Sequence, residues 1–540
     1  MSALAERLWQ AVEARPKLAL GLILAAQTVF ALDSRSLWFS DEVRYANAYE
    51  NVIRAGKWLV LSLNGQPYPD KPPVYFWLLA LLDALTPLSQ PAVFSLGVAL
   101  SGFAFLLATL GLARALGLAR PVGPAAGLVL LANLFFAGML HYSRMDMLFA
   151  ALIVACQACL YRGLASPAQS RWTVLGLALA GAAVLTKGPL GLALPLVACI
   201  AYLAWRGELA RLARRDVLFG LACFLGLVAA WLLAALAKEG DTFIRNIFYK
   251  QIFQRAVATY HHAEPPSYYF VALPLAWLPW TLLALSLPVR RLLSRAFWSG
   301  LWAGRRAAGA QAFLALSAGS GFVLLTCLSG KVLIYILPLF APLALLTAGR
   351  LLDPDAANLP RLWTAAAVLF LLLAAAGPFA PQIAGLAFPV RGLWLSSAIL
   401  AATGVALLTL RGRPARQPLL ALVLGVTLWM QPAALAVAPS LDPLMSPRGQ
   451  AEIIRDYARQ GFAPVAFDIY SGIYTYYAGR EIPEINDRAE LTAFLANHPK
   501  AVLAIRKKHW EPWPERPAGL GLKDERRIVD QVYVLAVQGE

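Results

Sequence analysis

The sequence predicts an all-α polytopic membrane protein that ends in a small α/β domain, and three features of the chain support this fold class. Of its 540 residues, 59% are hydrophobic and 14% charged, with a mean hydropathy of +0.61, whereas soluble proteins carry about 25% charged residues. The apolar residues form fourteen stretches of about 16–25 residues, from 18–32 to 418–438, and this length suits a bilayer-spanning helix. After about residue 440 the chain becomes much less apolar.

The formal net charge of +17 comes largely from arginines in short loops between apolar stretches. This distribution is typical of cytoplasmic loops, so we expect a membrane and no nucleic acid as partner. If all fourteen stretches crossed from a cytoplasmic N-terminus, the basic loops 206–215, 290–306 and 411–416 would lie outside. If 73–88 does not cross, all three lie in the cytoplasm. That stretch is short, starts at two prolines and contains Asp83, so we predict about thirteen crossings, periplasmic juxtamembrane helices and a multi-pass protein of the bacterial inner membrane.

This topology divides the chain into two domains. Residues 1–439 form the transmembrane domain, including the periplasmic loop 33–72, and residues 440–540 form a periplasmic α/β domain. Within the second domain we expect helices over 451–459 and 490–496, and strands over 464–467, 501–505 and 532–537.

The first outer loop predicts a helix that starts beside Asp41 and Glu42 and ends near Gly56. Ser40 or Asp41 can cap it, and the helix dipole favours ionised carboxylates in its first turn. Its apolar face, which includes Tyr45, can lie in the membrane interface. An ordinary capped surface helix fits the same pattern.

Three lysines, Lys71, Lys187 and Lys331, fall on the outer side, where the charge rule disfavours them. Each is either a snorkelling anchor or a clamp for a lipid-borne phosphate. Arg144 and Asp146 stand at the mouth of a membrane helix, where charged residues are functional candidates and are expected to have partners.

A metal site is a further hypothesis for the outer face. His262 and Asp70 would suit a divalent ion, zinc or magnesium, if the two loops meet; a solvated histidine is the alternative. Nucleotide-binding motifs are absent from the sequence, so no nucleotide cofactor is expected.

Together these motifs resemble the C-type fold glycosyltransferases that use polyprenyl-phosphate sugars, which include the protein O-mannosyltransferase superfamily, and among them the lipid A aminoarabinose transferases. The resemblance covers roughly 33–350 and rests on the following pieces: Asp41-Glu42-x-Arg44-Tyr45, Asp70-Lys71-Pro72, Arg144-Met145-Asp146, Lys187-Gly188-Pro189, His262 with Pro265, Tyr268-Tyr269, and Lys331 with Tyr335. Asp70 replaces the family's glutamate, and Val332-Leu333 replaces its usual Leu-Pro.

The resemblance implies a role for each matching residue. The candidate catalytic residues are Asp41, Arg44 and Asp146. Those expected to bind substrate are Lys71, Lys331, Tyr335, Tyr45, Tyr68, Glu42 and Lys187. Asp70 and His262 are the expected metal ligands.

The implied reaction moves 4-amino-4-deoxy-L-arabinose from undecaprenyl phosphate to lipid A at the periplasmic face. Lys71 and Lys331 would stabilise the charge on the departing phosphate. Asp41 would take a proton from a hydroxyl acceptor, or orient the sugar if the acceptor is already an anion. Galacturonic acid or a hexose as the sugar, and a glycan or protein as the acceptor, remain open.

Two other classes of protein fit the sequence less well. A transporter of lipid-linked sugars would show paired halves, and the sequence has no internal repeat. A scaffold would leave the outer lysines unexplained. We expect a monomeric enzyme.

Overall fold

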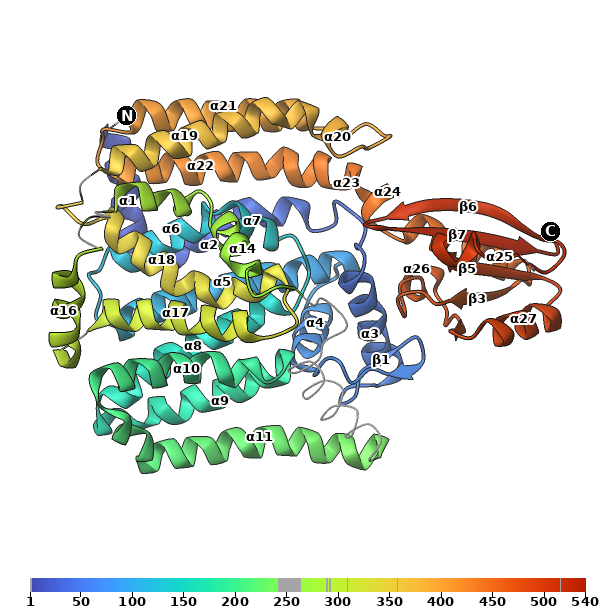
Figure 1. Cartoon of the computed structure of the whole chain (residues 1–540), viewed down its shortest axis with the longest axis horizontal. Coiled ribbons are helices and arrows are strands. Elements are labelled where there is room, and N and C mark those ends of the chain that lie inside the picture. Colours follow the sequence, from blue (N-terminus) through green and yellow to red (C-terminus); the bar gives the residue numbers. More distant parts are fainter. Residues whose placement is uncertain are drawn as a thin grey trace.

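The computed structural model of the chain describes residues 2–240, 264–287, 290, 293–307, 309–356, 358–514 and 516–540. Within these ranges it is mainly a bundle of apolar helices, with a small sheet at its C-terminal end (Figure 1). This arrangement confirms the predicted fold class.

Eight helices in the described part are long and apolar enough to cross a membrane, or nine if one bent pair is a single broken span. The bent pair is α14 (Tyr268–Ala276) with η5 (Trp280–Ser286), which meet at 94°. The eight are α5 (Gln90–Ala115), α8 (Asp146–Ala165), α11 (Arg215–Glu239), α17 (Ala310–Cys327), η7 (Leu333–Ile336) with α18 (Leu337–Leu351), α19 (Leu359–Ala376) through α20 (Ala380–Ile383), α21 (Leu393–Leu410), and α22 (Arg416–Pro432) through α23 (Ala438–Ser440). Shorter apolar helices are α2 (Pro16–Thr28) with η1 (Val29–Ala31), α4 (Val74–Leu85), α6 (Val122–Leu131) and α10 (Leu190–Arg206). The number of crossings, about thirteen, stays a prediction.

Helix α4 is the segment predicted not to cross. Its 12 residues span only about 18 Å, well short of a hydrocarbon core of about 30 Å. It packs against α5 and against α3 (Asp41–Ala55) at one end of the bundle (Figure 1).

Small residues bring neighbouring helices close together. Gly163 of α8 lies against the backbone of Thr173 in α9 (Ser170–Lys187), where an added Cβ would stand 2.4 Å from the Thr173 nitrogen. Gly176 of α9 faces the side chain of Leu160 in α8, where an added Cβ would stand 3.0 Å from the nearest carbon. Close approach at small residues supplies the packing that the hydrophobic effect does not provide between helices in lipid.

The two ends of the bundle differ as the charge pattern predicts. The N-terminus and α16 (Arg295–Ala303), which carries part of a basic loop, lie at one end, while α3, β1 (Ser62–Leu63) and the C-terminal sheet lie at the other (Figure 1).

Helix α3 begins at Asp41 and ends before Gly56, whose φ of 64° provides the left-handed cap. Ser40 precedes the helix, but its side chain makes no capping hydrogen bond. The apolar face packs on protein: Tyr45 contacts Phe76 with ring centroids 5.7 Å apart, and Tyr49 contacts Phe94 at 5.6 Å. The apolar face of α3 is therefore buried in the protein, whereas the sequence predicted that it could lie in the membrane interface.

The C-terminal sheet has five strands in the order β4-β3-β5-β7-β6. The predicted strands correspond to β3 (Ala463–Phe467), β5 (Ala501–Arg506) and β7 (Gln531–Gln538), and the predicted helices to α25 (Arg448–Arg459) and α27 (Arg488–Asn497). Strands β4 (Glu484–Ile485) and β6 (Leu520–Ile528) were not predicted. β6 is a charged edge strand, and charged side chains protect such edges from pairing with other chains.

This domain is fastened to the first outer loop. The Asn64 side chain donates to the Ile482 carbonyl at 2.7 Å and accepts from the Ile482 amide at 2.9 Å. The Phe39 amide donates to the Met445 carbonyl at 2.7 Å. The sheet therefore stands beside the loop that carries Asp41.

Candidate active site

The candidate site lies where several helix ends meet at this end of the bundle. Asp41 starts α3, Asp146 starts α8, and Lys187 ends α9 directly before Gly188, whose φ is 117°. Carboxylates in first turns and a lysine in a last turn agree with the helix dipoles. The motif Lys187-Gly188-Pro189 therefore marks the end of α9.

Four charged side chains form a chain of alternating sign. Arg144 donates from Nη2 to Asp41 Oδ2 at 2.8 Å and from Nε to Asp146 Oδ2 at 3.1 Å. The Lys187 ammonium pairs with the other oxygen of Asp146. Asp146 is buried, and the other three side chains are between 10% and 16% exposed. The structure thus brings together four residues from three segments of the chain, which the sequence could only predict to lie on the same side of the membrane.

Asp41 is held in its ionised form. Burial raises the pKa of its carboxyl, but the charges of Arg144, Lys71, Arg44 and Lys187 outweigh burial and lower the pKa from 3.8 to about 2. At neutral pH this residue is a carboxylate that cannot donate a proton and is a very weak base.

Aromatic rings line the cations. The Lys71 ammonium lies 6.0 Å from the Tyr45 ring centroid, and the Lys187 ammonium lies 4.1 Å from that of Tyr335. The Arg44 guanidinium lies 5.2 Å from the Tyr68 ring. Such contacts hold a cation without neutralising it.

Two of these tyrosines have buried hydroxyls without a hydrogen-bond partner in the described part of the chain, Tyr45 and Tyr68. A buried hydroxyl left unpaired costs about 1–3 kcal/mol. Burial raises the pKa of both hydroxyls, so each keeps its proton and is available as a donor. These hydroxyls suit a bound sugar or phosphate.

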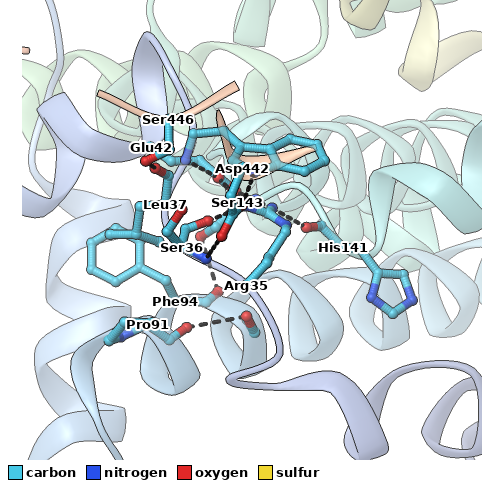
Figure 2. A network of polar contacts seen from close by, with 12 residues as sticks. Arg35, Ser36, Leu37, Glu42, Pro91, Phe94, His141, Ser143, Asp442 and Ser446 are labelled. Carbon is cyan, nitrogen blue, oxygen red and sulfur yellow. Dashed lines mark hydrogen bonds and ion pairs between the residues drawn. The ribbon is translucent and has the colours of Figure 1, made fainter. Parts of the chain in front are cut away.

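Glu42 has a different environment from its neighbour Asp41. It is fully buried, and the Arg35 guanidinium donates a hydrogen bond to each of its carboxylate oxygens, at 2.7 and 2.8 Å. Figure 2 shows this pair beside Ser143, whose amide donates to Glu42 at 2.6 Å, and the Trp38 amide donates to it at 2.8 Å. These contacts tie the first outer loop to the segment before α8. The predicted role of Glu42 in binding substrate stays a prediction.

Lys331 is set apart from the ion-pair chain. It is buried, and its ammonium donates to the carbonyls of Glu264 at 2.9 Å and Leu328 at 2.6 Å. Tyr335, four residues later, contacts the ion-pair chain, because its ring lies against the Lys187 ammonium. The sequence grouped Lys331 with Tyr335, whereas the structure pairs Tyr335 with Lys187.

Only one of the two predicted metal ligands, Asp70, lies in the described part of the chain. Burial lowers the pKa of the Arg44 guanidinium, and Asp70 is one of the neighbouring groups that raise it, after Tyr68, Tyr470 and Asp41. His262 falls outside the described residues. Among the residues the structure does describe, no three His, Cys, Asp or Glu side chains are grouped as metal ligands. The metal site therefore remains a prediction.

The sequence missed the contribution of the C-terminal domain. The Arg44 guanidinium lies 4.4 Å from the Tyr470 ring centroid, and its Nε donates to the Ser471 carbonyl at 3.0 Å. More than 400 residues separate the partners along the chain, and no local motif could have linked them.

The fold matches a solved structure over nearly its whole length. ArnT from Cupriavidus metallidurans bound to undecaprenyl phosphate aligns with a TM-score of 0.72 and 21% identity, covering 97% of this chain and 98% of that one. The chain has the ArnT fold.

Sequence comparisons agree with this fold. The family model described as dolichyl-phosphate-mannose-protein mannosyltransferase matches residues 70–233. The undecaprenyl phosphate-alpha-4-amino-4-deoxy-L-arabinose arabinosyl transferase of Pseudomonas savastanoi pv. phaseolicola is 30% identical over 340 residues, which cover 62% of this chain and 61% of that protein. The protein of the same name from Pseudomonas aeruginosa strain PAO1 is 30% identical over 326 residues, 60% of this chain and 57% of that one. The chain thus spans about three fifths of the length of these relatives, and the predicted resemblance is confirmed.

Proposed function

We propose that the chain is a membrane glycosyltransferase that moves 4-amino-4-deoxy-L-arabinose from undecaprenyl phosphate to lipid A, at the periplasmic face of the inner membrane. The observation that carries this proposal is the group of four cations around Asp41 that lower its pKa: Arg144, Lys71, Arg44 and Lys187. They stand at an end of a membrane bundle, where a lipid-linked donor can meet a water-facing acceptor. The names of the relatives support the choice of donor and sugar.

The charge balance of the site suits a polyprenyl-phosphate donor. The four cations face three carboxylates, Asp41, Asp146 and Asp70, which leaves one positive charge in excess. In such a donor the phosphodiester that joins the sugar to the polyprenol carries one negative charge, apart from the ammonium group of the aminoarabinose. The excess cation would therefore pair with the phosphodiester, and the cations would then stabilise the second negative charge that develops on the phosphate as the sugar leaves.

The reaction exchanges one carbon–oxygen bond for another. The bond from the anomeric carbon to the donor phosphate oxygen breaks, and its electron pair stays on the phosphate. An acceptor oxygen supplies the pair for the new bond to the anomeric carbon. The Asp41 carboxylate is suited to stabilise the positive charge that grows on the sugar between these events.

The low pKa of Asp41 favours an acceptor that is already an anion. A hydroxyl acceptor needs a base, and a carboxylate with a pKa of about 2 accepts protons poorly. A phosphate oxygen needs no base, so no proton has to move. Between the two acceptors left open by the sequence, this supports a phosphate, as on lipid A.

Mass spectrometry of lipid A from cells with and without the gene tests the proposal. We expect the aminoarabinose mass increment only when the gene is present. If lipid A stays unchanged while a membrane glycan changes, the donor class stands and the acceptor is wrong.

A further inference from the structure

The carboxyl ends of two parallel strands in the C-terminal sheet point toward the membrane helices. β3 and β5 are parallel, and β5 is antiparallel to β7. β7 runs outward to the C-terminus, at the far end of the molecule (Figure 1). The ends of β3 and β5 therefore face inward, and in open α/β sheets ligands bind at this edge of the strands.

A cluster of charged side chains occupies this edge. Asp468, directly after β3, binds Arg506 and His509, each at 2.6 Å. Burial lowers the pKa of His509; Asp468 raises it, and Arg506, Lys508 and Arg488 lower it again, so that the net pKa falls below 6.5. His509 is then largely neutral at pH 7, and three cations stand against one carboxylate.

The cluster adjoins the candidate active site. Tyr470 and Ser471, in the loop that begins at Asp468, hold Arg44, which lies one helical turn after Asp41. Tyr470 is 39% exposed, and the Phe39 ring supports it with centroids 6.0 Å apart. It offers a partly open aromatic ring that contacts Arg44 and lies two residues after Asp468 in the chain.

We propose that Arg506, Lys508 and His509 form a subsite for a phosphate group on the acceptor sugar, separate from the atom that reacts, with Tyr470 against the sugar ring. Guanidinium and ammonium groups are the usual partners of phosphate. An aromatic ring beside them suits the apolar face of a sugar. The inference rests on the proposed function, because it assumes a phosphorylated sugar acceptor.

Binding without turnover tests the subsite. The purified full-length chain is titrated calorimetrically with a water-soluble glucosamine disaccharide that carries a phosphate at each end. The same disaccharide without phosphate and glycerol phosphate serve as comparison probes. We expect the phosphorylated disaccharide to bind at least about tenfold more tightly than either.

The variants are chosen to separate charge from folding. Lys508 is exposed, so Lys508→Glu should fold normally and weaken binding of the phosphorylated disaccharide by about tenfold, while Lys508→Arg should bind as the wild type does. Lys500→Glu, at the opposite end of β5, is the matched charge reversal and should have no effect. Arg506→Gln should act like Lys508→Glu.

The possible outcomes are distinct. Unchanged binding by Lys508→Glu, or equal binding of the phosphorylated and plain disaccharides, would overturn the subsite. Equal binding of glycerol phosphate would overturn its preference for a sugar and indicate a phospholipid headgroup instead. If the probe binds as expected but no sugar is transferred, the subsite stands and the proposed function falls.

Discussion

Arg144 Nη2 lies 2.8 Å from Asp41 Oδ2, and this contact joins the first outer loop to the mouth of α8. The same arginine holds Asp146, which in turn holds Lys187. A buried charge is tolerated when it is paired and hydrogen-bonded. The chain of pairs therefore allows a carboxylate and several cations to share a poorly hydrated site.

The stability that Asp41 contributes should depend on pH. Its pKa in the folded protein is about 2, below its ordinary value of 3.8, so its contribution, about 2 kcal/mol, is present above pH 4 and is lost as pH falls toward 2. Asp41→Asn should therefore lower the thermal stability of the purified protein at pH 7, and the loss should be clearly smaller at pH 2.5. A stability difference that is unchanged between these two pH values would contradict the low pKa.

Lys71 should act on the chemical step. Lys71→Ala is expected to lower kcat by about 10²–10³-fold because the departing phosphate loses a fixed cation. Lys57→Ala, in the same outer loop, is the matched control and should leave turnover unchanged. Steady-state kinetics of the purified variants measures this effect. A near-normal kcat in Lys71→Ala would show that Lys71 does not stabilise the departing phosphate.

Asp146 and Lys187 should depend on each other for stability. Removing one member of a buried pair costs about 3–5 kcal/mol, because the other charge is left unpaired. Asp146→Asn and Lys187→Met should each lower the unfolding temperature, and the double variant should recover much of the loss while staying inactive. Additive losses in a double-mutant cycle would show that the two residues are not coupled.

The segment 73–88 should leave the turn before α5 outside the cell membrane. In a background without the five native cysteines, Pro87→Cys should react with a membrane-impermeant maleimide in intact spheroplasts. Ser299→Cys in α16, at the opposite end of the bundle, should react only after lysis. Labelling of Pro87→Cys only after lysis would mean that α4 crosses the membrane.

Local sequence signals predicted much of this structure. Short patterns in the sequence predicted the α3 helix and its end at Gly56, and the structure has both. Helix α16, which carries part of a basic loop, lies at the end of the bundle opposite to α3, as the charge pattern predicts. These features depend on residues close together in the chain.

The remaining features depend on contacts between distant segments. Lys187 and Asp146 lie 41 residues apart on different helices, and Arg44 meets Ser471 from another domain. The motif around Lys331 could not predict its partners, because its ammonium donates to two backbone carbonyls and any residue type can supply these. Sequence spacing identified these residue types but could not identify their partners.

Reconstitution tests the central claim most directly. The purified chain in nanodiscs is mixed with undecaprenyl phosphate-linked aminoarabinose and lipid A, and product is measured by mass spectrometry for the wild type and Asp41→Asn. We expect the wild type to form aminoarabinose-modified lipid A, and Asp41→Asn, although inserted and folded, to be slower by about 10²-fold or more. No product from the wild type, or equal rates from both proteins, would contradict a transferase site built around Asp41.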